Sequence, residues 1–76
     1  MYKLISFYQS VSNYPANARI IQVTPREYAL YIKHDVVGTV LYRSGYLCDL
    51  ETALFSFIPT GRTRPVLWKK VQQNGN

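Results

Sequence analysis

The side chains that could perform chemistry are few in this sequence. It contains one histidine, His34, one cysteine, Cys48, and four acidic residues. Side-chain catalysis needs a positioned pair or triad, such as a nucleophile with its base or two carboxylates in contrasting environments. We therefore expect a binding protein and not an enzyme; an enzyme that works through its backbone or its substrate is the weaker alternative. The acidic residues are Glu27, Asp35, Asp49 and Glu51.

The spacing of these residues does not indicate a catalytic or metal site. Cys48 precedes a predicted helix, a position that can activate a thiol, but nothing in the sequence places His34 beside it. A small buried or half-buried thiol and a turn histidine are the simpler interpretations. Asp49 and Glu51 are two residues apart, so they fit the first turn of a helix better than an acid and base pair. No Cys/His cluster has zinc spacing, and we predict neither a metal nor a cofactor.

Positive charge dominates the composition. Nine Lys or Arg stand against the four acids, which gives a net charge of +5 and an isoelectric point near 9.6. This balance favours anionic partners such as nucleic acid, an acidic protein surface or anionic lipid. A protein that is simply basic is the alternative, because net charge governs solubility and association and does not define a site.

The length of 76 residues predicts one domain. We place it at residues 1–71, followed by a frayed polar tail at residues 72–76. So small a domain buries only about 60% of its unfolded surface, and one cysteine cannot close an intrachain disulfide, so we expect a homodimer. The N-terminal apolar run is too short for a signal peptide, and no segment reaches the length of a membrane span. We expect a soluble, cytoplasmic protein with a reduced Cys48 and no membrane contact.

Runs rich in aromatic and β-branched residues predict five strands. In the first strand, Leu4, Ser6 and Tyr8 are expected on one face. Pro25 suits a tight turn between the second and third strands. The strands are placed at residues 2–9, 19–24, 27–33, 36–43 and 66–71.

The third and fourth strands are expected to form a hairpin. A two-residue loop at His34 and Asp35 suits residues that tolerate positive φ, and it would pair Lys33 with Val36. A one-residue slip would exchange the faces, and a longer loop over residues 33–38 is the alternative. The face expected to meet the core consists of Tyr28, Leu30, Ile32, Val37, Thr39 and Leu41.

The clearest helical pattern lies at residues 49–58. Asp49 fits the N-cap position, and Pro59 is expected to end the helix. A helix this short needs a sheet to pack on. Its apolar stripe, at helical period, consists of Leu50, Ala53, Leu54, Phe57 and Ile58.

The order β-β-β-β-α-β predicts an α+β fold, a small antiparallel sheet with one helix packed on one face. A small barrel of SH3 or OB type is the alternative. A sheet covered on one face leaves the other face to water or to a partner.

Two groups of residues are candidates for partner binding. Arg62 and Arg64 lie in a loop with Gly61 and Thr63, where guanidinium groups suit phosphate or acidic side chains; a solvated connection is the alternative. The second group interleaves aromatic and cationic residues on predicted strands, which can stack unpaired bases or can simply pack across strands. It consists of Tyr31, Lys33, Tyr42, Arg43, Trp68, Lys69 and Lys70.

These features favour a small non-enzymatic protein that contacts nucleic acid through a basic, aromatic surface. The alternative is a protein-binding adaptor or inhibitor, of the kind that mobile elements encode, that binds an acidic protein surface. Tyr, Trp and Arg dominate interface energetics, and a domain of this size cannot bury three phenylalanines, seven tyrosines and one tryptophan deeply. Self-association of the homodimer is a third use for exposed rings.

Overall fold

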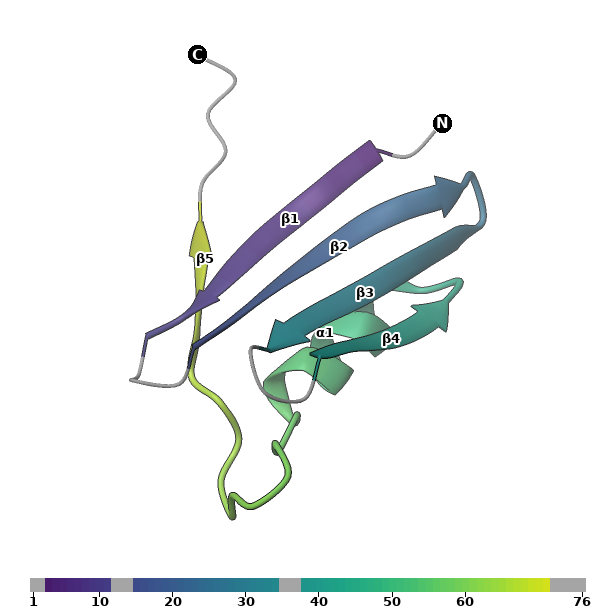
Figure 1. Cartoon of the computed structure of the whole chain (residues 1–76). Helices are drawn as coiled ribbons and strands as arrows, with labels where there is room; N and C mark the ends of the chain where they lie inside the picture. The colour runs from purple at the N-terminus through teal and green to yellow at the C-terminus, as the bar shows by residue number, and fades with distance from the viewer. Residues whose placement is uncertain (1–2, 12–14, 35–37, 72–76) are drawn as a thin grey trace.

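The computed structural model of the chain describes residues 3–11, 15–34 and 38–71. Five strands form one antiparallel open sheet in the order β4-β3-β2-β1-β5 (Figure 1). The predicted α+β fold and element order are confirmed, and the barrel alternative is wrong because β4 and β5 are the two edges of an open sheet. The elements are β1 (Lys3–Ser10), β2 (Ala16–Thr24), β3 (Glu27–His34), β4 (Gly38–Ser44), α1 (Leu47–Phe55) and β5 (Trp68–Val71).

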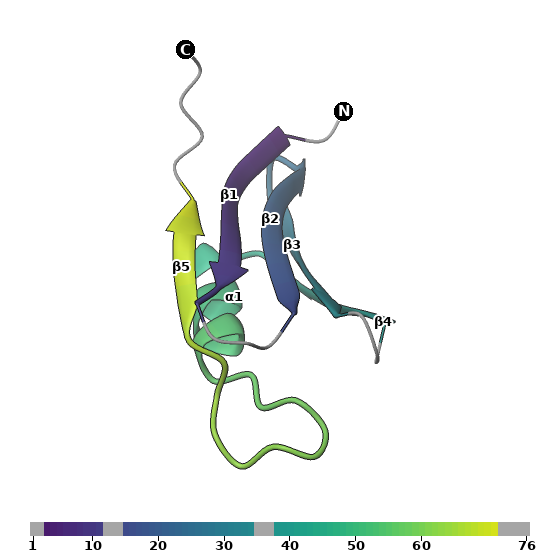
Figure 2. The same cartoon turned by 60° about the vertical axis from the view of Figure 1, so that its left-hand side comes forward.

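Helix α1 covers one face of the sheet and leaves the other face open (Figures 1 and 2). Alternate residues of the three central strands point towards the helix, where they pack against Leu50 and Leu54. Both leucines are almost completely buried, so a short helix that would be unstable alone is held by its apolar stripe. The strand residues of this core are Tyr8, Ala18, Ile20, Leu30 and Ile32.

The turn between β2 and β3 forms where Pro25 predicts it. Thr24 pairs with Glu27, and the backbone N–H of Arg26 donates to Thr24 Oγ1 at 3.2 Å. At its other end β2 begins at Ala16, earlier than the predicted residue 19. The cause is pairing with β3, because Ala16 lies opposite His34 and Ala18 opposite Ile32.

The predicted register of the β3–β4 hairpin is wrong. His34 pairs with Gly38 and Ile32 with Val40, so the connection consists of residues 35–37 and is closer to the longer-loop alternative. Gly38 has a φ of 94°, a conformation that residues with a Cβ rarely adopt, and this glycine marks the start of β4. His34 is a strand residue that is only 7% exposed, not a turn residue.

This register exchanges the two faces of β4. The core-facing residues of β3 are as predicted, since Tyr28, Leu30 and Ile32 all contribute to the core. Their partners on β4 are Ser44, Tyr42 and Val40. Because the pairing is displaced by an odd number of residues, Thr39 and Leu41 lie on the open face, contrary to the prediction. The predicted positions Asp35, Val36 and Val37 lie outside the described residues.

Strand β1 contains one extra residue. Leu4 pairs with Ile21, whereas Ser6 pairs with the neighbouring Ile20, so Ile5 has no partner of its own in this ladder. Ser6 and Tyr8 share a face as predicted, and the structure shows that this face is buried on the helix side. Leu4 was predicted to share their face, but the bulge turns it to the open face.

Helix α1 begins and ends earlier than its sequence pattern predicts. Tyr46 is the N-cap residue, without a side-chain cap. Asp49 lies in the first turn and accepts a 2.8 Å hydrogen bond from Ser44 Oγ, which ties the end of β4 to the helix. The last helical residue is Phe55, so Pro59 does not end the helix directly. Of the stripe residues beyond this end, Phe57 packs on the core and Ile58 is exposed.

A long connection, residues 56–67, crosses from α1 to β5 and extends beyond the end of the sheet (Figures 1 and 2). The backbone N–H of Arg62 donates to the Pro59 carbonyl at 3.0 Å, and Gly61 takes a φ of 85° within this turn. Strand β5 begins at Trp68 instead of the predicted residue 66. Val66 is nevertheless anchored, because its N–H donates to the Phe57 carbonyl.

Candidate functional site

The open face of the sheet carries a continuous cross-strand row of rings and one cation. Paired residues on antiparallel strands point to the same face, so the strand register defines this row directly. Arg19 lies at its centre, opposite Phe7 on β1 and Tyr31 on β3. The complete row, from β5 to β4, is Val71, Phe7, Arg19, Tyr31 and Leu41.

Arg19 interacts with the ring of Phe7. The guanidinium carbon lies 5.8 Å from the Phe7 ring centroid, within the range of a cation–π interaction. Arg19 is exposed, while Phe7 and Tyr31 are half-buried. The two rings are therefore held by the sheet, and the cation between them remains accessible to solvent and to a ligand.

Two further rows flank the central one. Towards the end of the sheet where β2 begins, Lys33 and Lys69 lie in a polar row, separated by Asn17 and Gln9. Towards the opposite end, Leu4, Ile21 and Ala29 form a more apolar row that ends at Arg43 on β4. The open face thus changes from polar to apolar along the strand direction.

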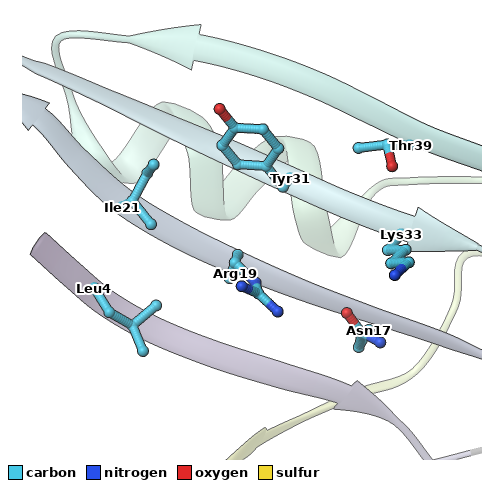
Figure 3. Close-up of a pocket in the computed structure, with 7 residues that line it drawn as sticks. All are labelled: Leu4, Asn17, Arg19, Ile21, Tyr31, Lys33 and Thr39. Atoms are coloured by element: carbon cyan, nitrogen blue, oxygen red, sulfur yellow. The ribbon is translucent and has the colours of Figure 1, made fainter. Parts of the chain in front are cut away.

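The centre of this face is hollowed. Figure 3 looks onto it with α1 behind the sheet. The hollow has a volume of about 530 Å³ and mixes apolar, aromatic and cationic side chains. A shallow surface of this composition suits a planar, partly anionic ligand better than a small apolar molecule, which needs a deeper pocket. Its lining residues are Leu4, Asn17, Arg19, Ile21, Tyr31, Lys33 and Thr39.

Positive charge is in excess on this face. One acid, Glu27, lies at its far end, where its Oε2 is 3.2 Å from Arg43 Nε. Both side chains are substantially exposed, so this pair neutralises Arg43 more than it stabilises the fold. Among the residues that the structure describes, Arg19, Lys33 and Lys69 have no acid paired opposite them in the strand register.

The structure divides the predicted aromatic and cationic residues between the two faces. Tyr31, Lys33, Arg43 and Lys69 lie on the open face. The others point to the helix side, since they pair with core-facing residues or with residues beside the core. These are Tyr42, which pairs with Leu30, Trp68, which pairs with Ser10, and Lys70, which pairs with Tyr8.

Arg62 and Arg64 are exposed and lie in the long connection, not in the strand rows of the open face. Together with Pro59, Thr63 and Pro65 they line a separate hollow of about 230 Å³, which Val66 and Leu67 complete. The predicted residues therefore belong to three surfaces and not to one.

The sequence interpretation names only Tyr31 among the five members of the central row and misses the other four. It uses Arg19 only as the first residue of a strand, places Leu41 in the core, and gives Phe7 and Val71 no binding role. The usable signal was the alternation of β1 and β2, which places Phe7 and Arg19 on the face opposite Tyr8 and Ala18. Their position beside Tyr31 depends on the strand order, which the sequence does not reveal.

The structure does not bring Cys48 and His34 together. Cys48 is exposed in the first turn of α1, so the expectation of a buried or half-buried thiol before the helix is wrong. His34 lies at the opposite end of the hairpin, beyond six residues of strand, which corresponds to about 20 Å. In residues 3–11, 15–34 and 38–71, no three His, Cys, Asp or Glu side chains gather as a metal site would require.

Comparisons with known proteins add no assignment. No family model, no curated protein and no solved structure matches the chain. In the part of the chain that the structure describes, no helix has the length and apolar character needed to cross a bilayer.

Proposed function

We propose that this protein binds nucleic acid through the open face of its sheet and acts by contact, without catalysis. The observation that supports this best is the row in which Arg19 lies between Phe7 and Tyr31, flanked by Lys33 and Lys69. Rings on a sheet face can stack bases, and neighbouring cations can bind phosphates. An anionic polymer would use both properties at once.

Adjacent lysines on β5 provide a matched test. Lys69 lies on the open face and Lys70 on the helix side, and both are exposed. Affinity for a fluorescently labelled oligonucleotide is measured by anisotropy at several salt concentrations. Because each neutralised phosphate contributes about 0.7–0.9 to the slope of log K against log salt, we expect Lys69→Gln to weaken binding and reduce that slope.

Lys70→Gln is the control for the loss of one positive charge from the same strand. We expect it to change affinity much less than Lys69→Gln. Equal effects of the two substitutions would indicate attraction to the net charge alone, and no binding at low salt would reject the proposal.

A second candidate function is contact with an acidic protein partner at the corner between α1 and β5. Phe55 is 51% exposed and Leu67 is 67% exposed. With Arg64, Pro65, Val66 and Trp68 they line a hollow of about 510 Å³. Exposed apolar side chains beside a guanidinium group fit a partner segment that carries both acidic and apolar residues.

Affinity capture tests this second candidate. Wild-type protein and a Leu67→Ser variant are immobilised, and acidic partners retained from lysate are identified and then rebound in purified form. Retention that depends on Leu67 supports the candidate, whereas binding only to a second copy of this chain assigns the corner to a homodimer. We also propose a cytoplasmic location, because the reducing cytoplasm would keep the exposed Cys48 thiol reduced.

A further inference from the structure

We infer that the ligand of the open face is an unpaired nucleic-acid strand, whose bases stack on Tyr31 and on the Arg19 guanidinium above Phe7 while its phosphates follow the row of Lys33 and Lys69. This inference rests on the proposed function and narrows it from nucleic acid in general to single strands. Three observations support it: the width of the sheet, the placement of Phe7 and Tyr31, and the spacing between the central row and the polar row.

The sheet is too broad to enter a groove of duplex DNA. Five strands at the usual separation span about 19 Å, whereas the major groove is about 12 Å wide and admits a helix or a two-stranded ribbon. Duplex DNA would therefore meet this face only through its phosphates. Its bases are stacked on one another, so the rings of Phe7 and Tyr31 would find no base surface to contact.

The Tyr31 ring and the Arg19 guanidinium above Phe7 are placed to receive separate bases. Phe7 is on β1 and Tyr31 on β3, so one strand separates them and their backbones lie about 10 Å apart. In Figure 3, which looks onto this face, the Tyr31 ring is turned so that its broad side is visible from solvent. Arg19 lies between the two rings, and its guanidinium plane can stack on a base or bind a phosphate.

The polar row runs parallel to the row of rings. Lys33 is two residues beyond Tyr31 on β3, and Gln9 is two residues beyond Phe7 on β1, so the rows are about 7 Å apart. A strand that crosses the sheet at right angles to the β-strands can therefore place its bases on one row and its phosphates on the other. The donors along the phosphate row are Lys33, Asn17, Gln9 and Lys69.

The test compares a labelled single-stranded oligonucleotide, the same sequence as a duplex, and a single strand with abasic sites at its centre. Wild-type protein is expected to bind the intact strand at least tenfold more tightly than the abasic strand, because each stacked base contributes a gain of this order. Tyr31→Leu is expected to remove about tenfold of the single-strand affinity and to leave duplex affinity within about twofold.

Tyr42→Leu is the matched control, since Tyr42 lies on the neighbouring strand but on the helix side. It should leave single-strand affinity within about twofold, and circular dichroism establishes that both variants are folded. If Tyr31→Leu does not fold, the affinities of wild-type protein for the intact and the abasic strand still test whether bases stack on the face. Equal affinity for intact, abasic and duplex ligands would overturn the stacking inference while leaving nucleic-acid binding in place. Absence of binding to all three would overturn both.

Discussion

The indole Nε1–H of Trp68 donates a hydrogen bond of 3.0 Å to the backbone carbonyl oxygen of Leu54. This bond joins the first residue of β5 to the last turn of α1. The Leu54 carbonyl also accepts from the backbone N–H of Phe57 at 3.2 Å, so Trp68 is its second donor at the end of the helix. The tryptophan that the sequence offers as a stacking residue therefore supports the fold.

Replacing Trp68 with Phe tests this role. The substitution keeps an aromatic ring against the core but removes the donor, so we expect the free energy of unfolding to fall by about 1 kcal/mol. Urea denaturation measures the change. Oligonucleotide affinity at low denaturant should match that of wild-type protein, and a substantial loss of affinity would return Trp68 to the binding surface.

Leu54 is the residue on which the packing of the helix depends most directly. Its side chain is fully buried between α1 and the sheet, so Leu54→Ala is expected to lower the free energy of unfolding by about 2–5 kcal/mol. A domain of this size has a total stability of about 4–11 kcal/mol, and the variant should be partly unfolded by mild heating. Glu51→Ala, on the exposed side of the same helix, is expected to change stability by less than about 0.5 kcal/mol.

Substitution of Gly61 is predicted to lower stability through its backbone conformation alone. Its φ is 85°, and a Cβ at this position would have no heavy atom within 4 Å. Gly61→Ala should therefore destabilise the protein by about 1–2 kcal/mol through backbone strain, without a steric clash. Gly61→Asn should be milder, because asparagine tolerates positive φ better. Thermal unfolding of the two variants compares them, and equal stabilities would contradict the assignment.

Glu27 reduces the net positive charge of the open face by pairing with Arg43. Glu27→Gln removes the partner of Arg43, and the exposed pair contributes at most about 1 kcal/mol, so stability should change little. Oligonucleotide binding should strengthen, and the slope of log K against log salt should steepen by up to about one, since Arg43 becomes available to phosphate. Unchanged binding would mean that the ligand does not reach this end of β4.

The expected homodimer is tested by sedimentation equilibrium. At micromolar concentration we expect a mass twice the 8.8 kDa of one chain, since small domains without disulfides or metals commonly gain stability by association. Cys48→Ser should give the same dimer mass as wild-type protein, which would exclude a disulfide between the exposed thiols of two chains as the cause of association. A monomer would direct the exposed Phe55 and Leu67 to another protein.

The sequence predicted the elements better than their registers. The alternation of Tyr28, Leu30 and Ile32 indicates both strand and core face, because a half-buried strand must repeat every two residues. The face of β4 could not be read in this way. Both of its faces carry apolar residues, so the length of the loop before Gly38 decides which face is buried.

The candidate site was only partly predictable for a similar reason. Tyr31 and Lys33 are recognisable from the sequence, because an aromatic and a cationic residue alternate there on one predicted strand. That Arg19 lies beside Tyr31, and Phe7 beside Arg19, follows from strand order, which joins residues far apart in the sequence. Leu4 reaches the open face only because Ile5 is an extra residue, and no local signal marked that bulge.

The pairing of β5 with β1 has a consequence for synthesis of the chain. β1 leaves the ribosome before the other strands of the sheet, and β5, which covers its outer edge, is made only after the helix and the long connection. Until then β1 presents unpaired backbone groups that could pair with another chain. Nascent or truncated chains that lack residues 68–71 are thus the species most exposed to misassembly, and they are where a chaperone would act.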